Sequence, residues 1–377
     1  MIKVIYVISD TNIGGAGKCV LTFLKYYDRS KINLKIILPQ SSLLIPKIRE
    51  LGGVYIEIEG IADQSLGFSA IRRLKKIFAD EKPDIVHAHA SMSARIAARL
   101  YKTDNGKRAK IVFTRHSVFE PSKLLSCGLG KKINGFVNNK TADKIIAVAD
   151  AAKDNIVKTG VDPHKITVIQ NGVEPLRRVD EQEFLKLKAK YNAEDGECLG
   201  GIAARLNEVK GHIYILEALK MLKDDGIKMK LLIAGTGEWE PVIRNKAAEL
   251  DIVHEVIMAG FVDDVTGIMN LIDVNINASF GTEATSLALL EGMSVGTPCI
   301  VSDFGGNPGV VTDGVNGLIF KTKDSRDLYL KLKRFICEDG LKQKLSENAE
   351  KVFNSKFRAE IMTRKTEQVY YDLSEDR

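Results

Sequence analysis

Two carboxylates stand eight residues apart, Glu283 and Glu291, within the stretch 277–320. The pattern around them predicts a strand (273–276), a glycine-containing loop, a helix that opens at Glu283, and a second strand (298–301). If both glutamates lie on the helix, the axial rise between them is about 12 Å. They could then hydrogen-bond hydroxyls at the two ends of a sugar nucleotide whose phosphates face the helix N-terminus. A buried helix with two surface glutamates would give the same pattern.

Arg205 and Lys210 are the cations that could serve the same ligand. They lie in a loop between a predicted strand (199–203) and a predicted helix (214–222). Two cations there could neutralise a diphosphate, although a solvated loop is the alternative. No Asp-x-Asp occurs in the chain. We therefore expect neither a metal ion nor another cofactor.

A glycine-rich loop, residues 10–17, follows the first predicted strand (3–8) and contains Gly14 and Gly15. Glycines between a strand and a helix let a phosphate or a sugar approach the backbone, and a tight turn without a ligand is the alternative. The P-loop pattern fails, because Asn12 and Cys19 stand where it needs Gly and Ser or Thr. The dinucleotide fingerprint Gly-x-Gly-x-x-Gly is absent.

Three histidines follow predicted strands of the same half of the chain: His87, His89 and His116. Ligands of open α/β sheets bind beyond the carboxyl ends of the strands, which places these side chains well. A metal site is not expected, because no carboxylate or cysteine has ligand spacing to them. We single out His116 as a site residue, with a partly exposed loop histidine as the alternative.

Charge is divided unevenly along the chain. Residues 1–178 hold 30 Lys and Arg against 16 Asp and Glu, a net +14, whereas residues 179–377 hold 25 against 33, a net −8. Basic faces suit anionic membranes, nucleic acids or phosphorylated ligands, but we find no nucleic-acid motif. In residues 124–140, apolar side chains recur at helical spacing beside lysines, as in an interfacial helix or a core helix.

The chain of 377 residues is long enough for two domains. Strands alternate with helices up to the break at residues 171–175 and again after it, so we expect a doubly wound parallel sheet in each part. The boundaries are predicted at 1–175 and 176–356, with a C-terminal helix (357–377) packing back on the first domain. Scattered cysteines and the absence of a signal peptide or a membrane-length apolar run favour a cytoplasmic protein.

In this order and spacing, the motifs resemble those of the retaining glycosyltransferases of family 4. The motifs are the Gly14-Gly15 loop, His87-Ala88-His89, Thr114-Arg115-His116, residues 168–173, Arg205 with Lys210-Gly211, residues 234–237, Glu283-x7-Glu291 and Gly296-Thr297-Pro298. The resemblance implies the GT-B fold, two Rossmann-like domains facing a central cleft. One departure is Ala16-Gly17-Lys18, where the family often has an acidic residue or Gln and then Arg, and this leaves the acceptor pocket open.

The resemblance also implies roles for individual residues. Glu283 would contact the donor hexose, Glu291 the ribose, Arg205 and Lys210 the diphosphate, and His116 the donor sugar. The other substrate-binding positions it implies are Gly14 and Gly15 on the acceptor side, Gly235, the backbone at Phe261 and Val262 beside the base, and the amides of Ala284, Thr285 and Ser286. Glu283, His116, Arg205 and Lys210 would form the catalytic set, without a metal.

The expected activity is metal-independent, retaining transfer of a hexose or N-acetylhexosamine from a nucleotide-diphosphate sugar. A UDP-sugar is favoured over a GDP-sugar, and the acceptor would be a glycan or a lipid-linked molecule of cell-envelope polysaccharide or glycoconjugate synthesis. The basic first domain would contact the inner face of an anionic membrane, and nucleic acid is not an expected partner. A nucleotide-sugar epimerase of the same fold and a non-catalytic partner subunit are the alternatives.

Overall fold

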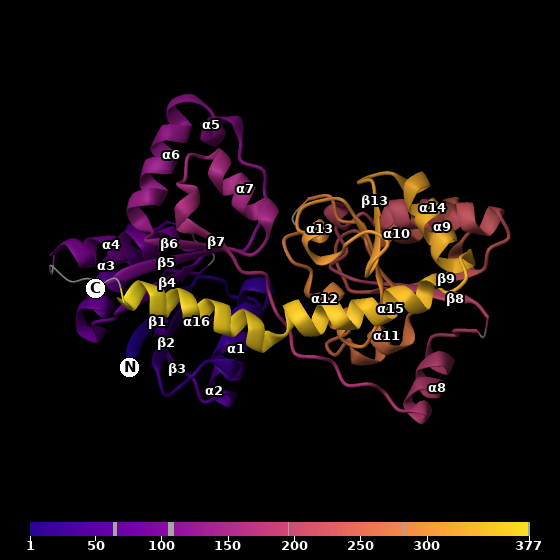
Figure 1. The fold of residues 1–377 in the computed structure, drawn as a ribbon, viewed down its shortest axis with the longest axis horizontal. Helices are drawn as coiled ribbons and strands as arrows, with labels where there is room; N and C mark the ends of the chain where they lie inside the picture. The colour runs from indigo at the N-terminus through magenta and orange to yellow at the C-terminus, as the bar shows by residue number, and fades with distance from the viewer. Residues whose placement is uncertain (63–65, 105–108, 195, 282, 376–377) are drawn as a thin grey trace. The chain divides into compact units, whose positions relative to one another are not determined.

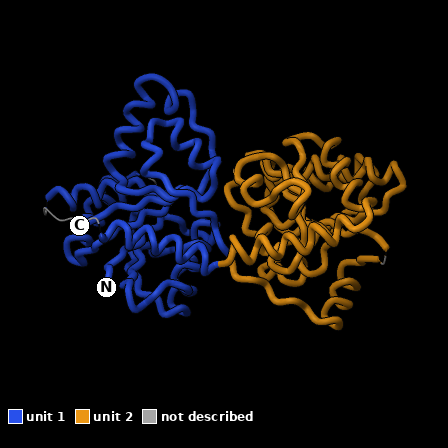
Figure 2. The backbone as a smooth tube through the Cα atoms, viewed as in Figure 1, with its two compact units in different colours: residues 1–172, 359–377 blue, residues 173–358 orange. Residues whose placement is uncertain are grey.

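The computed structural model describes residues 1–62, 66–104, 109–194, 196–281 and 283–375. They form two compact units (Figure 2). Unit 1 comprises residues 1–172 together with 359–377, and unit 2 comprises residues 173–358. The end of the chain therefore returns to the unit that its beginning forms.

Unit 1 is built on a seven-stranded parallel sheet of order β3-β2-β1-β4-β5-β6-β7. Its strands are β1 (Ile2–Ile8), β2 (Ile32–Pro39), β3 (Val54–Ile58), β4 (Ile85–His89), β5 (Lys110–Arg115), β6 (Lys144–Ala147) and β7 (Ile166–Val168). Side chains alternate between the two faces: Val4 and Tyr6 of β1 join one apolar cluster, and Ile5 and Val7 join the other. Both faces are thus buried, as a parallel sheet requires.

Helices cover both faces of this sheet (Figure 1). They are α1 (Gly15–Tyr26), α2 (Leu44–Glu50), α3 (Phe68–Glu81), α4 (Met92–Asp104), α5 (Lys123–Ser126), α6 (Gly128–Thr141), α7 (Asp150–Lys158) and α16 (Ala359–Glu375). α16 packs beside α1, and Met362, Val369 and Tyr370 lie in the same buried cluster as Tyr6. The last helix of the chain is therefore part of the core of unit 1.

Unit 2 repeats the architecture with a six-stranded parallel sheet of order β10-β9-β8-β11-β12-β13. Its strands are β8 (Cys198–Ala203), β9 (Met229–Ala234), β10 (Val256–Gly260), β11 (Val274–Asn277), β12 (Cys299–Ser302) and β13 (Gly317–Phe320). Its helices are α8 (Glu181–Lys190), α9 (His212–Asp224), α10 (Glu240–Glu249), α11 (Thr266–Leu271), α12 (Leu287–Ser294), α13 (Asn307–Val310), α14 (Ser325–Cys337) and α15 (Leu341–Val352). The short turns are η1 (Pro163–Lys165) in unit 1 and η2 (Glu208–Lys210), η3 (Val253–Glu255) and η4 (Phe353–Phe357) in unit 2.

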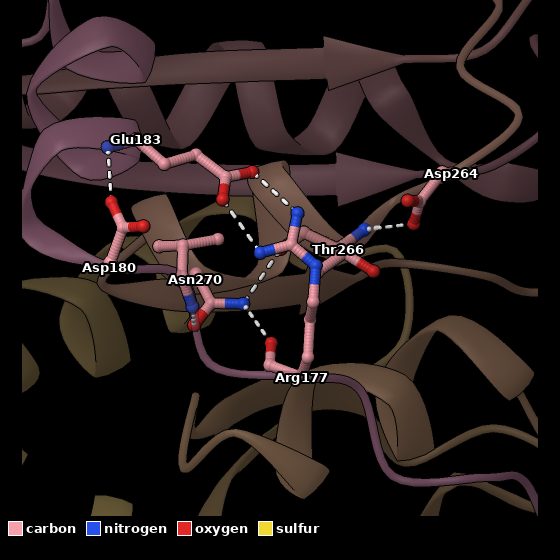
Figure 3. A network of polar contacts seen from close by, with 7 residues as sticks. Arg177, Asp180, Glu183, Asp264, Thr266 and Asn270 are labelled. Carbon is pink, nitrogen blue, oxygen red and sulfur yellow. Dashed lines mark hydrogen bonds and ion pairs between the residues drawn. The ribbon is translucent and has the colours of Figure 1, made fainter.

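The segment that opens unit 2 is held on that unit by polar contacts (Figure 3). The amide of Asn270 in α11 donates to the Arg177 carbonyl at 3.0 Å and accepts from the Val179 backbone N–H at 3.2 Å. The Arg177 guanidinium donates twice to the Glu183 carboxylate, at 2.6 and 2.7 Å. Asp180 caps α8 by accepting from the Glu183 N–H at 2.8 Å. The segment that directly follows the predicted boundary is thus anchored to unit 2 over this stretch.

No helix in the described ranges is both long enough and apolar enough to cross a bilayer.

Candidate active site

In unit 2 the strand order reverses between β8 and β11, which are paired neighbours. Open parallel sheets bind ligands at this point, beyond the carboxyl ends of the strands. The loop after β8 carries Arg205 and Lys210, and the loop after β11 carries Glu283. The sheet therefore brings together residues that lie more than 70 positions apart in the sequence.

Glu283 and Lys210 form the central contact of this site. The Lys210 ammonium donates to Oε2 of Glu283 at 2.6 Å, and Glu283 is buried. Asn277 Nδ2 and Ser279 Oγ donate to the same oxygen at 3.2 and 2.9 Å. No described residue donates to Oε1 of Glu283, so one carboxylate oxygen has the capacity to accept from a substrate hydroxyl.

The surroundings of Glu283 keep its carboxylate ionised. Burial by itself would raise the pKa of this carboxyl, but the Lys210 charge and the hydrogen bonds from Lys210, Asn277 and Ser279 outweigh it. The net pKa lies below the ordinary value for a glutamate. The group is thus an acceptor of hydrogen bonds at neutral pH.

Gly211 allows the two loops to approach. Its φ is +70°, and a Cβ there would lie 2.2 Å from the Ala278 carbonyl oxygen. The Phe280 N–H also donates to the Val209 carbonyl at 2.9 Å. Close backbone packing therefore sets Lys210 beside Glu283.

Arg205 is exposed, and its guanidinium makes no hydrogen bond or ion pair with the described residues. Gly235 follows β9 with a φ of +144°, and a Cβ on it would lie 1.9 Å from the Ala204 carbonyl oxygen. Gly235 thus supports the loop that carries Arg205 by close packing. A cation without an acidic partner at this edge of the sheet can serve an anionic ligand.

The prediction that the helix opens at Glu283 is wrong. α12 begins at Leu287, with Ser286 at its N-cap, so Glu283 and Glu291 do not share a helix and the expected 12 Å rise does not apply. The Glu283 carbonyl instead accepts from the Gly306 N–H at 3.0 Å. Tertiary contacts in the loop thus override the helical pattern of the Ala- and Leu-rich sequence.

The remaining predicted residues of unit 2 lie in neighbouring segments. Ala284 and Thr285 are buried directly before α12, and Glu291 lies within that helix, partly exposed. Phe261 and Val262 follow β10, two strands away from β8, and Phe261 is 73% exposed. A large apolar side chain that is this exposed is available to a flat ligand such as a base.

In unit 1 the three histidines form two adjoining hydrogen-bonded groups. His89 Nδ1 lies 3.0 Å from His116 Nε2, while the two nitrogens of His87 lie 2.5 Å from the Tyr370 hydroxyl and 2.6 Å from the Thr114 hydroxyl. Burial lowers the pKa of His116 to about 4. Burial and the His116 charge lower the pKa of His87 to about 3. These rings are therefore neutral at pH 7 and can donate and accept hydrogen bonds.

Gly14 and Gly15 stand at the start of α1, at the carboxyl end of β1. Neither has a positive φ, and a Cβ on either would meet no atom within 4 Å. The folded chain by itself therefore does not require glycine at these two positions.

Three residues of these sites were not predicted from the sequence. Asn277 and Ser279 bond to Glu283, and Tyr370 bonds to His87. Asn277 and Ser279 lie inside the stretch that was singled out, but polar residues after a strand are too common to be diagnostic. Tyr370 could not be found, since it lies 283 residues beyond the histidine that it contacts. Within the described ranges, no group of three or more His, Cys, Asp or Glu side chains is placed to hold a metal ion.

Comparison with known families defines the class. The family model "Glycosyl transferases group 1" matches residues 183–352, and the model "Glycosyltransferase Family 4" matches residues 13–177. The protein is a glycosyltransferase, and the two Rossmann-like units are those of the GT-B fold. Together the two models match residues 13–177 and 183–352, and the chain belongs to glycosyltransferase family 4, which confirms the family that the motifs resemble.

Several known proteins resemble most or nearly all of the chain. A putative glycosyltransferase of Bacillus subtilis, EpsD, is 26% identical over 319 residues, covering 81% of each protein. The UDP-Gal:alpha-D-GlcNAc-diphosphoundecaprenol alpha-1,3-galactosyltransferase of Escherichia coli is 28% identical over 309 residues, covering 80% of this chain and 78% of that one. The crystal structure of Anabaena Alr3699/HepE in complex with UDP has a TM-score of 0.85 at 18% identity and covers 99% of this chain and 100% of that one.

Proposed function

We propose that this protein is a retaining, metal-independent glycosyltransferase that uses a UDP-sugar as its donor. The transferred group would be a hexose or an N-acetylhexosamine. The acceptor would be a glycan or a lipid-linked molecule in the synthesis of cell-envelope polysaccharide or a glycoconjugate. A GDP-sugar is the second choice of donor.

One observation carries this proposal: the ionised Glu283 carboxylate, held by Lys210 at the point where the strand order of unit 2 reverses. In the proposed reaction Oε1 of Glu283 accepts from a hydroxyl of the donor hexose. Arg205 and Lys210 offset the negative charge that develops on the departing diphosphate. These two cations perform the charge neutralisation that a divalent metal provides in other sites.

The other predicted residues take supporting roles in this proposal. Glu291 binds the ribose hydroxyls, Phe261 and Val262 contact the base, and the amides of residues 284–286 and the backbone at Gly235 face the phosphates and sugar. In unit 1, His116 as a neutral imidazole hydrogen-bonds the donor sugar. Gly14 and Gly15 leave room for the acceptor. This role would explain why glycines stand at two positions where the fold itself could accommodate a Cβ.

Two comparisons support the choice of donor. The name of the E. coli relative specifies UDP-Gal and a lipid-diphosphate acceptor, and the Anabaena protein was crystallised in complex with UDP. We also propose that the protein works at the inner face of the plasma membrane, where a lipid-linked acceptor would be found, with the basic unit 1 toward the lipid.

A panel of UDP- and GDP-sugars tests the function. We expect slow hydrolysis or transfer with at least one UDP-sugar, undiminished by a chelator, and a product whose anomeric configuration matches the donor by NMR. An epimerised sugar released without an acceptor would instead indicate the epimerase. Absence of both turnover and binding across the panel would contradict the proposal.

A further inference from the structure

An exposed apolar surface lies on α5 and α6 of unit 1. We call it the α5–α6 surface and define it by five residues with exposed side chains: Leu124 (77%), Leu125 (43%), Leu129 (73%), Ile133 (55%) and Phe136 (64%). Exposed large apolar residues elsewhere in the described chain are more widely scattered, whereas these five fall within 13 consecutive positions. A contiguous apolar patch of this kind marks a place where a partner or a membrane binds.

α6 is amphipathic, but its apolar face is exposed, whereas a helix that covers a core buries its apolar face. Leu129, Ile133 and Phe136 recur at spacings of four and three residues, which places them on one face, and that face is exposed. The apolar stripe is therefore not a core stripe, which excludes one of the two interpretations that the sequence left open.

The opposite face of α6 packs on unit 1 through glycine and asparagine. Gly135 is buried, and a Cβ on it would lie 2.3 Å from the Gly160 carbonyl oxygen. Asn134 donates to the Thr159 carbonyl at 3.2 Å, and Asn138 accepts from Arg95 at 2.8 Å. Polar contacts and close backbone packing hold the helix, so its apolar side chains remain available to bind something else.

Within the segment that carries the surface, the charged side chains are all of one sign. Lys123, Lys131, Lys132 and Lys140 are exposed, and residues 123–141 contain no Asp or Glu. None of the four lysines forms an ion pair with the residues that the structure describes. The Lys140 ammonium lies 5.9 Å from the centre of the Phe136 ring, so the positive charge borders the apolar stripe. An apolar surface whose own segment carries lysines and no acidic residue complements an anionic lipid surface.

We propose that the α5–α6 surface docks unit 1 on an anionic lipid bilayer. Leu129, Ile133 and Phe136 enter the boundary between head groups and acyl chains, and the lysines contact the lipid phosphates. The inference rests on the proposed function only in that the bilayer would also present a lipid-linked acceptor. The basic charge of unit 1 does not by itself say which part of the unit contacts the lipid. The exposed apolar residues of α5 and α6 identify that part.

Vesicle sedimentation of the full chain tests the proposal without relying on catalysis. The vesicles are phosphatidylcholine alone and phosphatidylcholine mixed with phosphatidylglycerol. We expect binding to the mixed vesicles, weakened by salt, and little binding to phosphatidylcholine alone. Leu129→Ser/Ile133→Ser/Phe136→Ser should lose it, and Lys132→Gln/Lys140→Gln should weaken it about tenfold or more. The control Phe68→Ser, at a position 88% exposed on α3, should bind like the wild type.

Wild-type protein that stays in solution with mixed vesicles at low salt would overturn the proposal. So would Ser and Gln variants that both bind like the wild type. The Gln variant changes only exposed lysines, which keeps the test decisive if the Ser variant fails to fold. Hydrolysis of a UDP-sugar in solution, measured on the same samples, distinguishes the two proposals: a protein that binds vesicles but never turns over a donor would contradict only the enzymatic one.

Discussion

At the scale of single residues, the Lys210–Glu283 contact makes a prediction about activity. Glu283→Gln keeps the shape of the side chain but removes the charge that Lys210 neutralises and the strong acceptor for a sugar hydroxyl. We expect kcat/KM for transfer to fall on the order of 10²-fold or more, since the donor sugar would lose its orientation. Arg205→Ala should instead weaken donor binding about tenfold, because under the proposed function it removes a charged contact to the diphosphate.

Arg244→Ala is the matched control for Arg205→Ala, since Arg244 is also exposed in unit 2 but pairs with Glu240 on α10 at 2.8 Å. Steady-state kinetics and UDP titration measure both effects. Full activity in Glu283→Gln would remove this residue from the reaction.

Glu283 also predicts how stability depends on pH. Its pKa is lower in the folded protein than in the unfolded chain, so its contribution to stability is present above the ordinary glutamate range and is lost as the pH falls through the folded value. We expect Glu283→Gln to be less stable than the wild type at pH 7, by about 1–3 kcal/mol. The difference should shrink below pH ~4. Urea denaturation at several pH values measures it, and a difference that stays constant with pH would contradict the assigned charge.

The same substitution, glycine to alanine, should have different effects on stability at Gly211 and at Gly15. Gly211→Ala should destabilise the protein by about 1–3 kcal/mol, because φ is +70° and the new Cβ would collide with the Ala278 carbonyl. Gly15→Ala should leave stability nearly unchanged, because the new Cβ would meet no atom within 4 Å. It should reduce transfer, since under the proposed function the acceptor occupies this space. Denaturation and transfer assays on both variants test the pair. A Gly15→Ala enzyme that transfers normally would show that the acceptor does not approach this loop.

At the scale of elements, one hydroxyl of α16 makes polar contacts with two strands of the sheet, β1 and β4. The Tyr370 hydroxyl lies 2.6 Å from that of Tyr6 and 2.5 Å from His87 Nδ1, and all three side chains are buried. Tyr370→Phe leaves polar groups buried without a partner, which we expect to cost about 1–3 kcal/mol. Tyr371→Phe, a partly exposed neighbour, is the control. Equal stability of the two variants would show that this contact does not hold α16.

The elements also show what a sequence can predict. The strands predicted at 3–8, 199–203, 273–276 and 298–301 lie within one residue of β1, β8, β11 and β12, because buried parallel strands read as short apolar runs between turns. The edge strand β13 was not predicted. Helix starts were less accurate. α1 begins at Gly15, inside the stretch predicted as a glycine-rich loop, because glycines weaken the helical signal. α12 begins four residues later than predicted, because Glu283 bonds to Lys210 and Gly306. Such long-range contacts carry no local signal.

At the scale of the whole molecule, the chain leaves unit 1 at residue 172 and returns to it at residue 359. Removing residues 359–377 should therefore destabilise unit 1 and leave unit 2 folded. The truncation takes Met362, Val369, Tyr370 and Leu373 out of the core of unit 1. Burying each such side chain is worth about 1.5–3 kcal/mol, so the loss is comparable to the stability of a whole domain.

Differential scanning calorimetry with UDP tests this division. In the full chain we expect UDP to stabilise unit 2, by about 2.7 kcal/mol at 100 times its dissociation constant. In the chain ending at Arg358, the transition of unit 1 should move to a lower temperature or vanish, while the transition that responds to UDP remains. A truncated chain in which unit 1 melts unchanged would mean that α16 adds nothing to its core. Loss of the UDP response would mean that the nucleotide site depends on more than unit 2.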